Sequence, residues 1–247
     1  ADHAITTTRG DDTFDNYGTI VIGNSGADGW GAGITLAAGA DTMTNHEGAL
    51  IQIDRAGGSG LHFGSEDGPA SPDTLINNGI ITILSSATAG IAFGAGDDIL
   101  INTGTIFIGE ITDINDGGDI YPGIAMGQGD DTLTTSTALD FDYNLEGGGG
   151  DDILNLEGDG DFTFDADIWN FEDLNKNGAS SWTLNGDVDA YNVVNLNTGT
   201  LIVNGDIASD TVTIAADTLF GRTNTITGDL INNGSVAPGN SIGTISI

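Results

Sequence analysis

Hydrophobic and polar residues alternate in short runs along most of this chain. The positions that stay apolar from one run to the next are two residues apart within a run. In one stretch they are Ile91, Phe93, Leu100, Ile106 and Ile108. A period of two places alternate side chains on the same face of a β-strand. The pattern therefore predicts short strands, each with one face turned toward a core.

The runs belong to a repeated phrase built on an aspartate that follows a glycine-rich step, as in GDDTFDNYGTIVIG and GDDILINTGTIFIG. The marker aspartates are Asp12, Asp41, Asp73, Asp98, Asp131 and Asp152, with spacings of 29, 32, 25, 33 and 21 residues. Constant phrases separated by gaps of variable length indicate fixed strands joined by variable turns.

Three strands per unit with inward apolar pairs predict an all-β fold, a right-handed parallel β-helix (β-solenoid) with three short strands per coil. A hairpin sandwich is the rival, but its two-residue turns would not recur at matching places in every unit. One coil leaves both of its faces open, so neighbouring coils must stack to bury them. The recurring Asn16, Asn45, Asn77 and Asn102 are expected to form an amide ladder at one corner.

The chain is expected to be a single β-helix over residues 1–247, with a Gly-Asp repeat half (1–158) and a carboxy-terminal half (159–247). In the second half the repeated Gly-Asp phrase no longer occurs. There the spacing of Trp169, Phe171 and Leu174 allows a helical turn over residues 165–174. Short strands with Gly-Asp and Asn-Gly turns follow it.

Composition removes several classes of function. The chain has 37 acidic side chains against 4 basic ones, a net charge of −33, so it lacks the basic face that a nucleic-acid-binding protein needs. It has no cysteine, which excludes disulfides, thiol nucleophiles and cysteine-ligated metals. No run is long and apolar enough for a transmembrane helix. The amino terminus does not read as a signal peptide, which we expect to be removed or to lie outside this sequence.

Two carboxy-terminal phrases, NFEDLNKNGASSWTLNG and INNGSVAPGNSIGTISI, resemble the passenger domains of bacterial autotransporters (type V secretion). The resemblance covers about the last 80 residues. It implies an extracellular right-handed β-helix that is exported through the outer membrane to the bacterial cell surface. It also implies attachment to the membrane only through a β-barrel translocator, which this sequence does not contain.

Paired carboxylates are the candidate metal ligands. The segment GGGGDDIL (147–154) fits the calcium-binding pattern G-G-x-G-x-D-x-U, and the segments at 94 and 127 fit most of it. Calcium takes six to eight hard oxygens. Stacked carboxylates repel each other, and a cation, solvation, raised pKa values or high salt would relieve that repulsion. Solvated turn residues are the competing interpretation. The candidate ligands are Asp11, Asp12, Asp97, Asp98, Asp130, Asp131, Asp151 and Asp152.

Catalytic residues are not expected. The three histidines are His3, His46 and His62. A triad needs a serine activated by a histidine, but serine is scarce around His46 and His62 and no nucleophile-elbow phrase occurs. An Asp-rich groove could hold the two carboxylates of an inverting glycosidase. A uronate lyase needs cations to neutralise its substrate, and the four scattered basic residues of this acidic chain would not hold a polyanion.

Recognition elements are expected on protrusions. The longest loops of the repeat half are 25–31, 64–73 and 110–121, and loops of this kind carry binding residues. The tripeptide Arg9-Gly10-Asp11 has the sequence that integrins recognise, but it falls on the Gly-Asp step of the repeat itself. The large aromatic residues sit in unlike segments and are expected to pack beneath loops rather than to stack on sugars. They are Trp30, Tyr121, Trp169 and Trp182.

The sequence thus predicts a non-catalytic, surface-exposed structural or adhesive β-helix that needs no cofactor, with calcium as the candidate ion. Its expected partners are proteins or glycans of a host or neighbouring-cell surface, and self-association stays open. One alternative is a secreted calcium-dependent β-roll-like module, whose fold would require the ion. The other is a polysaccharide-active β-helix enzyme.

Overall fold

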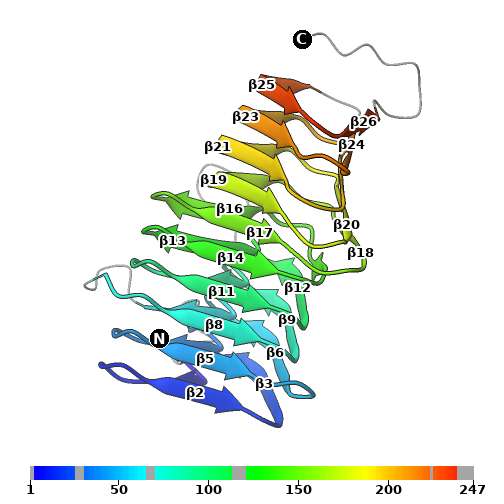
Figure 1. Ribbon diagram of the computed structural model, residues 1–247. Helices are drawn as coiled ribbons and strands as arrows, with labels where there is room; N and C mark the ends of the chain where they lie inside the picture. The colour runs from blue at the N-terminus through cyan, green and yellow to red at the C-terminus, as the bar shows by residue number, and fades with distance from the viewer. Residues whose placement is uncertain (1–2, 26–30, 65–69, 113–120, 223–224, 238–247) are drawn as a thin grey trace.

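The chain coils into a stack of parallel strands (Figure 1). The computed structural model describes residues 3–25, 31–64, 70–112, 121–222 and 225–237. Every strand pairing within this part of the chain is parallel, and each strand pairs with the equivalent strands of the coils before and after it. The predicted parallel β-helix is confirmed, and none of the described residues lies in a helix that could cross a membrane.

Three stacks of strands make up the sides of the first coils. The first contains β1 (Ile5–Thr6), β4 (Ile34–Leu36), β7 (Leu61–Phe63), β10 (Ile91–Ala92), β13 (Ile124–Gln128) and β16 (Leu145–Gly149). The second contains β2 (Thr13–Asn16), β5 (Thr42–Asn45), β8 (Thr74–Asn77), β11 (Ile99–Asn102), β14 (Thr132–Thr135) and β17 (Ile153–Leu156). The third contains β3 (Thr19–Ser25), β6 (Leu50–Ala56), β9 (Ile80–Ser86), β12 (Thr105–Ile111) and β15 (Leu139–Asp140).

The later coils are built differently. The first two stacks converge on one run of long strands: β19 (Ile168–Lys176), β21 (Val188–Leu196), β23 (Ile207–Ile214) and β25 (Ile226–Asn232). A separate sheet forms the other side: β18 (Asp161–Phe164), β20 (Ser181–Leu184), β22 (Thr200–Val203), β24 (Leu219–Arg222) and β26 (Ser235–Ala237). Each later coil thus has two strands instead of three. The strands of the first two sides are joined into one long strand, and only a register shift remains where the corner was.

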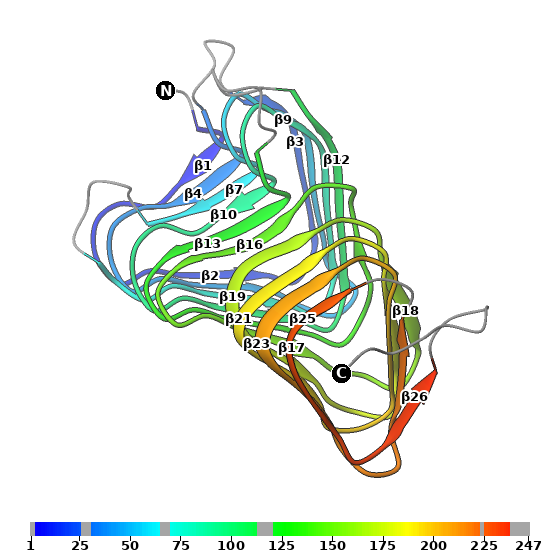
Figure 2. The same cartoon turned by 90° about the horizontal axis from the view of Figure 1, so that it is seen from above.

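The view along the stack shows a three-sided outline for the early coils and right-handed winding of the chain (Figure 2). Right-handed crossovers are the rule for parallel strands because of the strand twist. The predicted hand is therefore the one observed.

Matched apolar positions form continuous columns inside the stack, as the sequence predicts. Leu75, Leu100, Leu133 and Leu154 lie in register on successive coils and have no exposed surface. The columns of isoleucines on the third side behave in the same way. Each fully buried side chain of this size contributes about 1.5–3 kcal/mol, but only when a neighbouring coil covers it.

The predicted helical turn over 165–174 is wrong, because most of this segment forms β19. Phe171 and Leu174 are fully buried, whereas Trp169 is 42% exposed. The three-residue spacing arises from a register shift between residues 168 and 173, where Asn170 adopts a positive φ of 54°. An irregular residue in a strand mimics helical spacing because it moves the following side chains to the opposite face.

The predicted asparagine ladder is present at the corner between the second and third sides. The side-chain amide of each asparagine donates to Oδ1 of the next, over 2.9 Å from Asn16 to Asn45, 2.9 Å from Asn45 to Asn77 and 2.8 Å from Asn77 to Asn102. The same amides also donate to backbone carbonyl oxygens of the following turns. The ladder therefore satisfies the polar groups of a buried turn.

Candidate functional site

The Gly-Asp-Asp steps form the corner between the first and second sides of each early coil. A glycine in the left-handed region opens the turn, with φ of 142° at Gly96 and 134° at Gly129. A Cβ on Gly129 would lie 2.0 Å from the carbonyl oxygen of Gly96 on the preceding coil. Only glycine therefore allows the coils to approach this closely at the corner.

Each Asp-Asp step sends its two side chains in opposite directions, because consecutive residues of an extended chain alternate. The second aspartates of these steps point inward, as do the equivalent Asp41 and Asp73, which follow an alanine and a proline. Together they form what we call the inner row: Asp12, Asp41, Asp73, Asp98, Asp131 and Asp152. Those from Asp41 onward are at most 1% exposed, and Asp12 is half-buried. The first aspartates form the outer row, and all four lie in solvent: Asp11, Asp97, Asp130 and Asp151.

The inner row joins consecutive coils through hydrogen bonds from backbone N–H groups to carboxyl oxygens. The backbone N–H of Asp98 donates to Oδ1 of Asp131 at 2.6 Å, and that of Asp131 donates to Oδ1 of Asp152 at 2.8 Å. The same bond recurs at every earlier step of the row. The row ends where the N–H of Asp152 donates to Oε2 of Glu172 at 2.6 Å. Sequence reasoning missed Glu172, which replaces the aspartate once the corner is lost.

Burial changes the acidity of the inner row. Desolvation raises the pKa of Asp73 and Asp98 to about 7, that of Asp131 to about 8 and that of Asp152 to about 6. The backbone N–H donors oppose this shift, and neighbouring carboxylates add to it. The pKa of Asp41 is also raised, chiefly by desolvation.

The outer row makes hydrogen bonds in the opposite direction along the stack. Oδ1 of Asp97 accepts the backbone N–H of Asp130, and Oδ1 of Asp130 accepts that of Asp151, both at 3.0 Å. Oδ1 of Asp11 accepts the N–H of Ala40 at 3.0 Å. These bonds fit the interpretation of the outer aspartates as solvated turn residues that hold backbone amides.

The structure thus separates the eight predicted calcium ligands into two rows of four rather than bringing each pair together. Asp12, Asp98, Asp131 and Asp152 lie on the inner row, and Asp11, Asp97, Asp130 and Asp151 lie on the outer row. Within the described residues, no three His, Asp or Glu side chains converge in a metal-binding group. Any ion at this corner must therefore take most of its ligands from the backbone.

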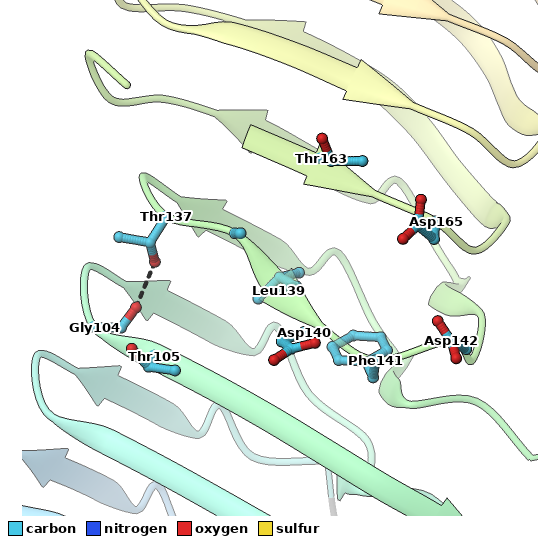
Figure 3. Close-up of a pocket in the computed structure, with 10 residues that line it drawn as sticks. Gly104, Thr105, Thr137, Leu139, Asp140, Phe141, Asp142, Thr163 and Asp165 are labelled. Atoms are coloured by element: carbon cyan, nitrogen blue, oxygen red, sulfur yellow. Dashed lines mark hydrogen bonds between the residues drawn. The ribbon is translucent and has the colours of Figure 1, made fainter. Parts of the chain in front are cut away.

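A groove lies where the third stack ends at β15 and the new sheet begins at β18 (Figure 3). It has a volume of about 310 Å³. Its walls carry the carboxylates of Asp140, Asp142 and Asp165 and the side chains of Thr105 and Thr163. Oδ1 of Asp165 accepts a hydrogen bond from the side-chain amide of Asn185 on the next coil. The groove falls near the boundary at residue 158, but nothing in the sequence indicated that the two sheets fail to pair there.

A second groove of about 330 Å³ continues past Asp140 and Asp142 to Glu110 and Tyr143. Both grooves are lined by acidic groups, and none of the lysines and arginines in the described part of the chain lines either of them. The chemistry available here is hydrogen bonding to hydroxyl groups or attraction of a cation.

The histidines contact neighbouring coils. Nδ1 of His3 lies 3.1 Å from the backbone nitrogen of Ala32. Nε2 of His46 lies 2.8 Å from Oδ1 of Asp15, and its ring stacks on Tyr17 with centroids 3.9 Å apart. His62 lies half-buried on β7.

Lys176 is a cation whose side chain is fully buried. Lys176 continues the corner column of the asparagine ladder, and its ammonium group donates to the carbonyl oxygens of Asn177, Gly178 and Thr198 at 2.6–3.1 Å. Burial lowers its pKa to about 8, although Glu157 opposes this. No pattern in the sequence indicates this role, because lysine differs from the asparagines of that column.

The predicted recognition elements are only partly visible. Trp30 and most of the loops 25–31, 64–73 and 110–121 lie outside the described residues. Trp182 is buried and its indole N–H donates to the carbonyl oxygen of Glu157 at 2.9 Å, and Tyr121 packs half-buried against the core. Trp169 is the exception, since it is exposed. Arg9 and Asp11 are exposed as well.

Comparisons with known proteins identify no relatives. No family model matches the chain, no curated protein matches it, and no solved structure matches its fold at a significant level.

Proposed function

We propose that this chain is a stiff, non-catalytic β-helix segment that is exposed on a bacterial cell surface, where it serves as a structural or adhesive element. The observation that carries the proposal is the continuous parallel register, which links strand to strand from β2 to β25. Each coil buries the apolar face of its neighbours, so the segment resists bending and offers a long outer surface. Stacked repeats of this kind use such surfaces for binding.

The outer surface suits an exported, extended protein. Its charge is strongly negative, which keeps rods apart in solution. The resemblance of the carboxy-terminal phrases to autotransporter passengers supports export through the outer membrane. The expected partners are proteins or glycans on a host or neighbouring cell.

A polysaccharide-active enzyme is the second candidate. The observation in its favour is the groove between β15 and β18, where Asp140, Asp142 and Asp165 lie beside threonine hydroxyls. Two carboxylates across a groove are the minimum for glycoside hydrolysis.

One binding experiment tests the main proposal. Fluorescently labelled chain is added to host epithelial cells, to bacterial cells and to a glycan array, with polyglutamate of equal charge as the control. We expect saturable binding to at least one surface that unlabelled chain displaces and polyglutamate does not. Binding to none of them would contradict the adhesive role.

The enzyme candidate is tested on the same preparation. Release of reducing sugar from a panel of polysaccharides, abolished in Asp140→Asn or Asp165→Asn but not in Asp189→Asn, would replace the main proposal with a catalytic one. The control residue Asp189 is an aspartate of β21 that does not line the groove.

A third measurement addresses the calcium-dependent β-roll alternative. Far-UV circular dichroism in excess chelator should keep the β-signal and a cooperative unfolding transition, because the apolar columns hold the coils together without an ion. Loss of the folded signal in chelator would favour the β-roll module.

A further inference from the structure

Five inner-row aspartates keep one carboxylate oxygen that is buried and has no hydrogen-bond partner. These atoms are Oδ2 of Asp12, Asp41, Asp98, Asp131 and Asp152. In the last four, Oδ1 already accepts a backbone N–H from the coil before. Buried polar atoms in folded proteins are almost always satisfied, so each exception needs an explanation. Five of the six inner-row positions have such an oxygen, and a positively charged partner that repeats with the coils would satisfy them.

The spacing of the row suits one kind of cation. Ile99, Thr132 and Ile153 are partners in register, so Asp98, Asp131 and Asp152 lie on three consecutive coils. Parallel strands are about 4.8 Å apart, and an ion midway between two stacked oxygens would lie about 2.4 Å from each. Calcium–oxygen distances are about 2.3–2.6 Å, whereas magnesium requires about 2.0–2.1 Å. The register therefore matches calcium better than magnesium.

We propose that the inner row binds calcium ions in the two intervals from Asp98 to Asp131 and from Asp131 to Asp152, through the carboxylate oxygens that lack a partner.

Glycines beside the row allow the backbones of neighbouring coils to approach closely. Gly127 and Gly148 are partners in register just before Asp131 and Asp152, and both have a positive φ. A Cβ on Gly148 would lie 1.9 Å from the carbonyl oxygen of Gly127. No side chain therefore separates the carbonyl groups of one coil from the next. Backbone carbonyl oxygens are hard ligands of the kind that complete calcium coordination, and an ion held by two carboxylates would need them.

No side-chain cation of the described residues neutralises the inner row. No described lysine or arginine forms an ion pair with it, and the buried ammonium group of Lys176 is held by backbone carbonyl oxygens. Without a cation, burial and mutual repulsion favour the protonated carboxyls, and the pKa of Asp131 rises to about 8. Protons are therefore the competing occupants, and they must be removed before calcium is tested.

The experiment uses the full chain, freed of metal with chelator and dialysed at about pH 9, where the carboxyls are ionised. Calcium or magnesium is added, and binding is followed by calorimetric titration and by the melting temperature. The test variant is Asp131→Asn, which keeps an Oδ1 acceptor for the N–H of Asp98 but lacks the free oxygen. Asp130→Asn is the matched control, because it removes one charge from the neighbouring outer-row position.

We expect calcium at about a hundredfold above its dissociation constant to raise the melting temperature of the unmodified chain by about 5–10 °C per site. Magnesium should raise it less. Asp130→Asn should keep the full rise, and Asp131→Asn should lose most of it because that residue borders both intervals. If circular dichroism shows that Asp131→Asn does not fold, Asp152→Asn takes its place and should lose the contribution of one interval.

Three results would overturn the proposal. The first is a melting temperature that calcium does not move. The second is an equal rise in Asp131→Asn and Asp130→Asn, which would assign the effect to the outer row or to general screening. The third is recovery of stability on acidification to about pH 5 with none from calcium at about pH 9, which would assign the row to protons alone. None of these results bears on adhesion, so this proposal and the proposed function fail independently.

Discussion

Two adjacent aspartates of one step behave as different chemical groups. Asp130 lies in solvent, while Asp131 has no exposed surface and sits between two other carboxylates of the inner row. The difference arises from the alternation of side chains along an extended backbone, which sends one inward and the next outward. A residue pair that looks like a bidentate site in the sequence is thus divided between core and surface.

The inner row predicts how stability depends on pH in the metal-free protein. The folded pKa values of Asp73 and Asp98, about 7, lie above the ordinary value of 3.8. Below about pH 4 both the folded and the unfolded chains are protonated, and the stabilisation is complete. As the pH rises, the unfolded chain releases its protons first, so the free energy of unfolding should fall between about pH 4 and pH 8.

The measurement is the melting temperature from pH 4 to pH 9 in chelator. Asp98→Asn should flatten the slope, because it removes one of the titrating buried groups. Asp97→Asn, its exposed neighbour, should leave the slope close to that of the unmodified chain. A melting temperature that rises over this range would contradict the assignment of the row as buried acids.

At the scale of the strand, burial on one face decides which substitutions matter. On β11, Leu100 faces the core with no exposed surface, while Ile101 faces outward and is 36% exposed. Leu100 also stacks on leucines of the coils before and after it. A substitution on the inner face therefore changes the packing of its own coil and of the coils on both sides.

Leu100→Ala should lower the free energy of unfolding by about 2–5 kcal/mol, because it opens a cavity in a column that cannot collapse along the stack. Ile101→Ala, on the same strand with a similar change in volume, should cost less than about 1 kcal/mol. Urea denaturation followed by circular dichroism compares the two. Equal losses would mean that the inward and outward faces have been assigned incorrectly.

At the scale of the molecule, charge opposes the compact state. The net charge of −33 is spread along one rod, and within the described residues the contact of ion-pair type is that of His46 with Asp15, which is charged only when the imidazole is protonated. Self-repulsion of this kind destabilises the folded chain, while packing of the coils opposes it. Screening by salt should shift this balance toward the folded state.

Raising potassium chloride from about 0.01 M to about 0.15 M shortens the screening length from about 30 Å to about 8 Å. The melting temperature at pH 7 should rise over this range in the presence of chelator. Sucrose at matched osmolality serves as an uncharged control. A melting temperature that falls as salt is added would show that attractive charge contacts dominate instead.

Local pattern determined the class of fold. The alternating columns, the Gly-Asp turns and the asparagine ladder depend on a period of two and on which residues tolerate a turn, and both are visible in a single unit. The leucine column from Leu75 to Leu154 and the ladder from Asn16 to Asn102 were predictable for this reason.

Only the tertiary structure decided what happens where coils of different length meet. The fusion of two strands into β19, the groove beside Asp140, the replacement of an aspartate by Glu172 and the buried ammonium group of Lys176 all depend on which residues of neighbouring coils come opposite each other. That juxtaposition is set by the register between segments about 20 to 33 residues apart, and the alternation within one strand carries no information about it.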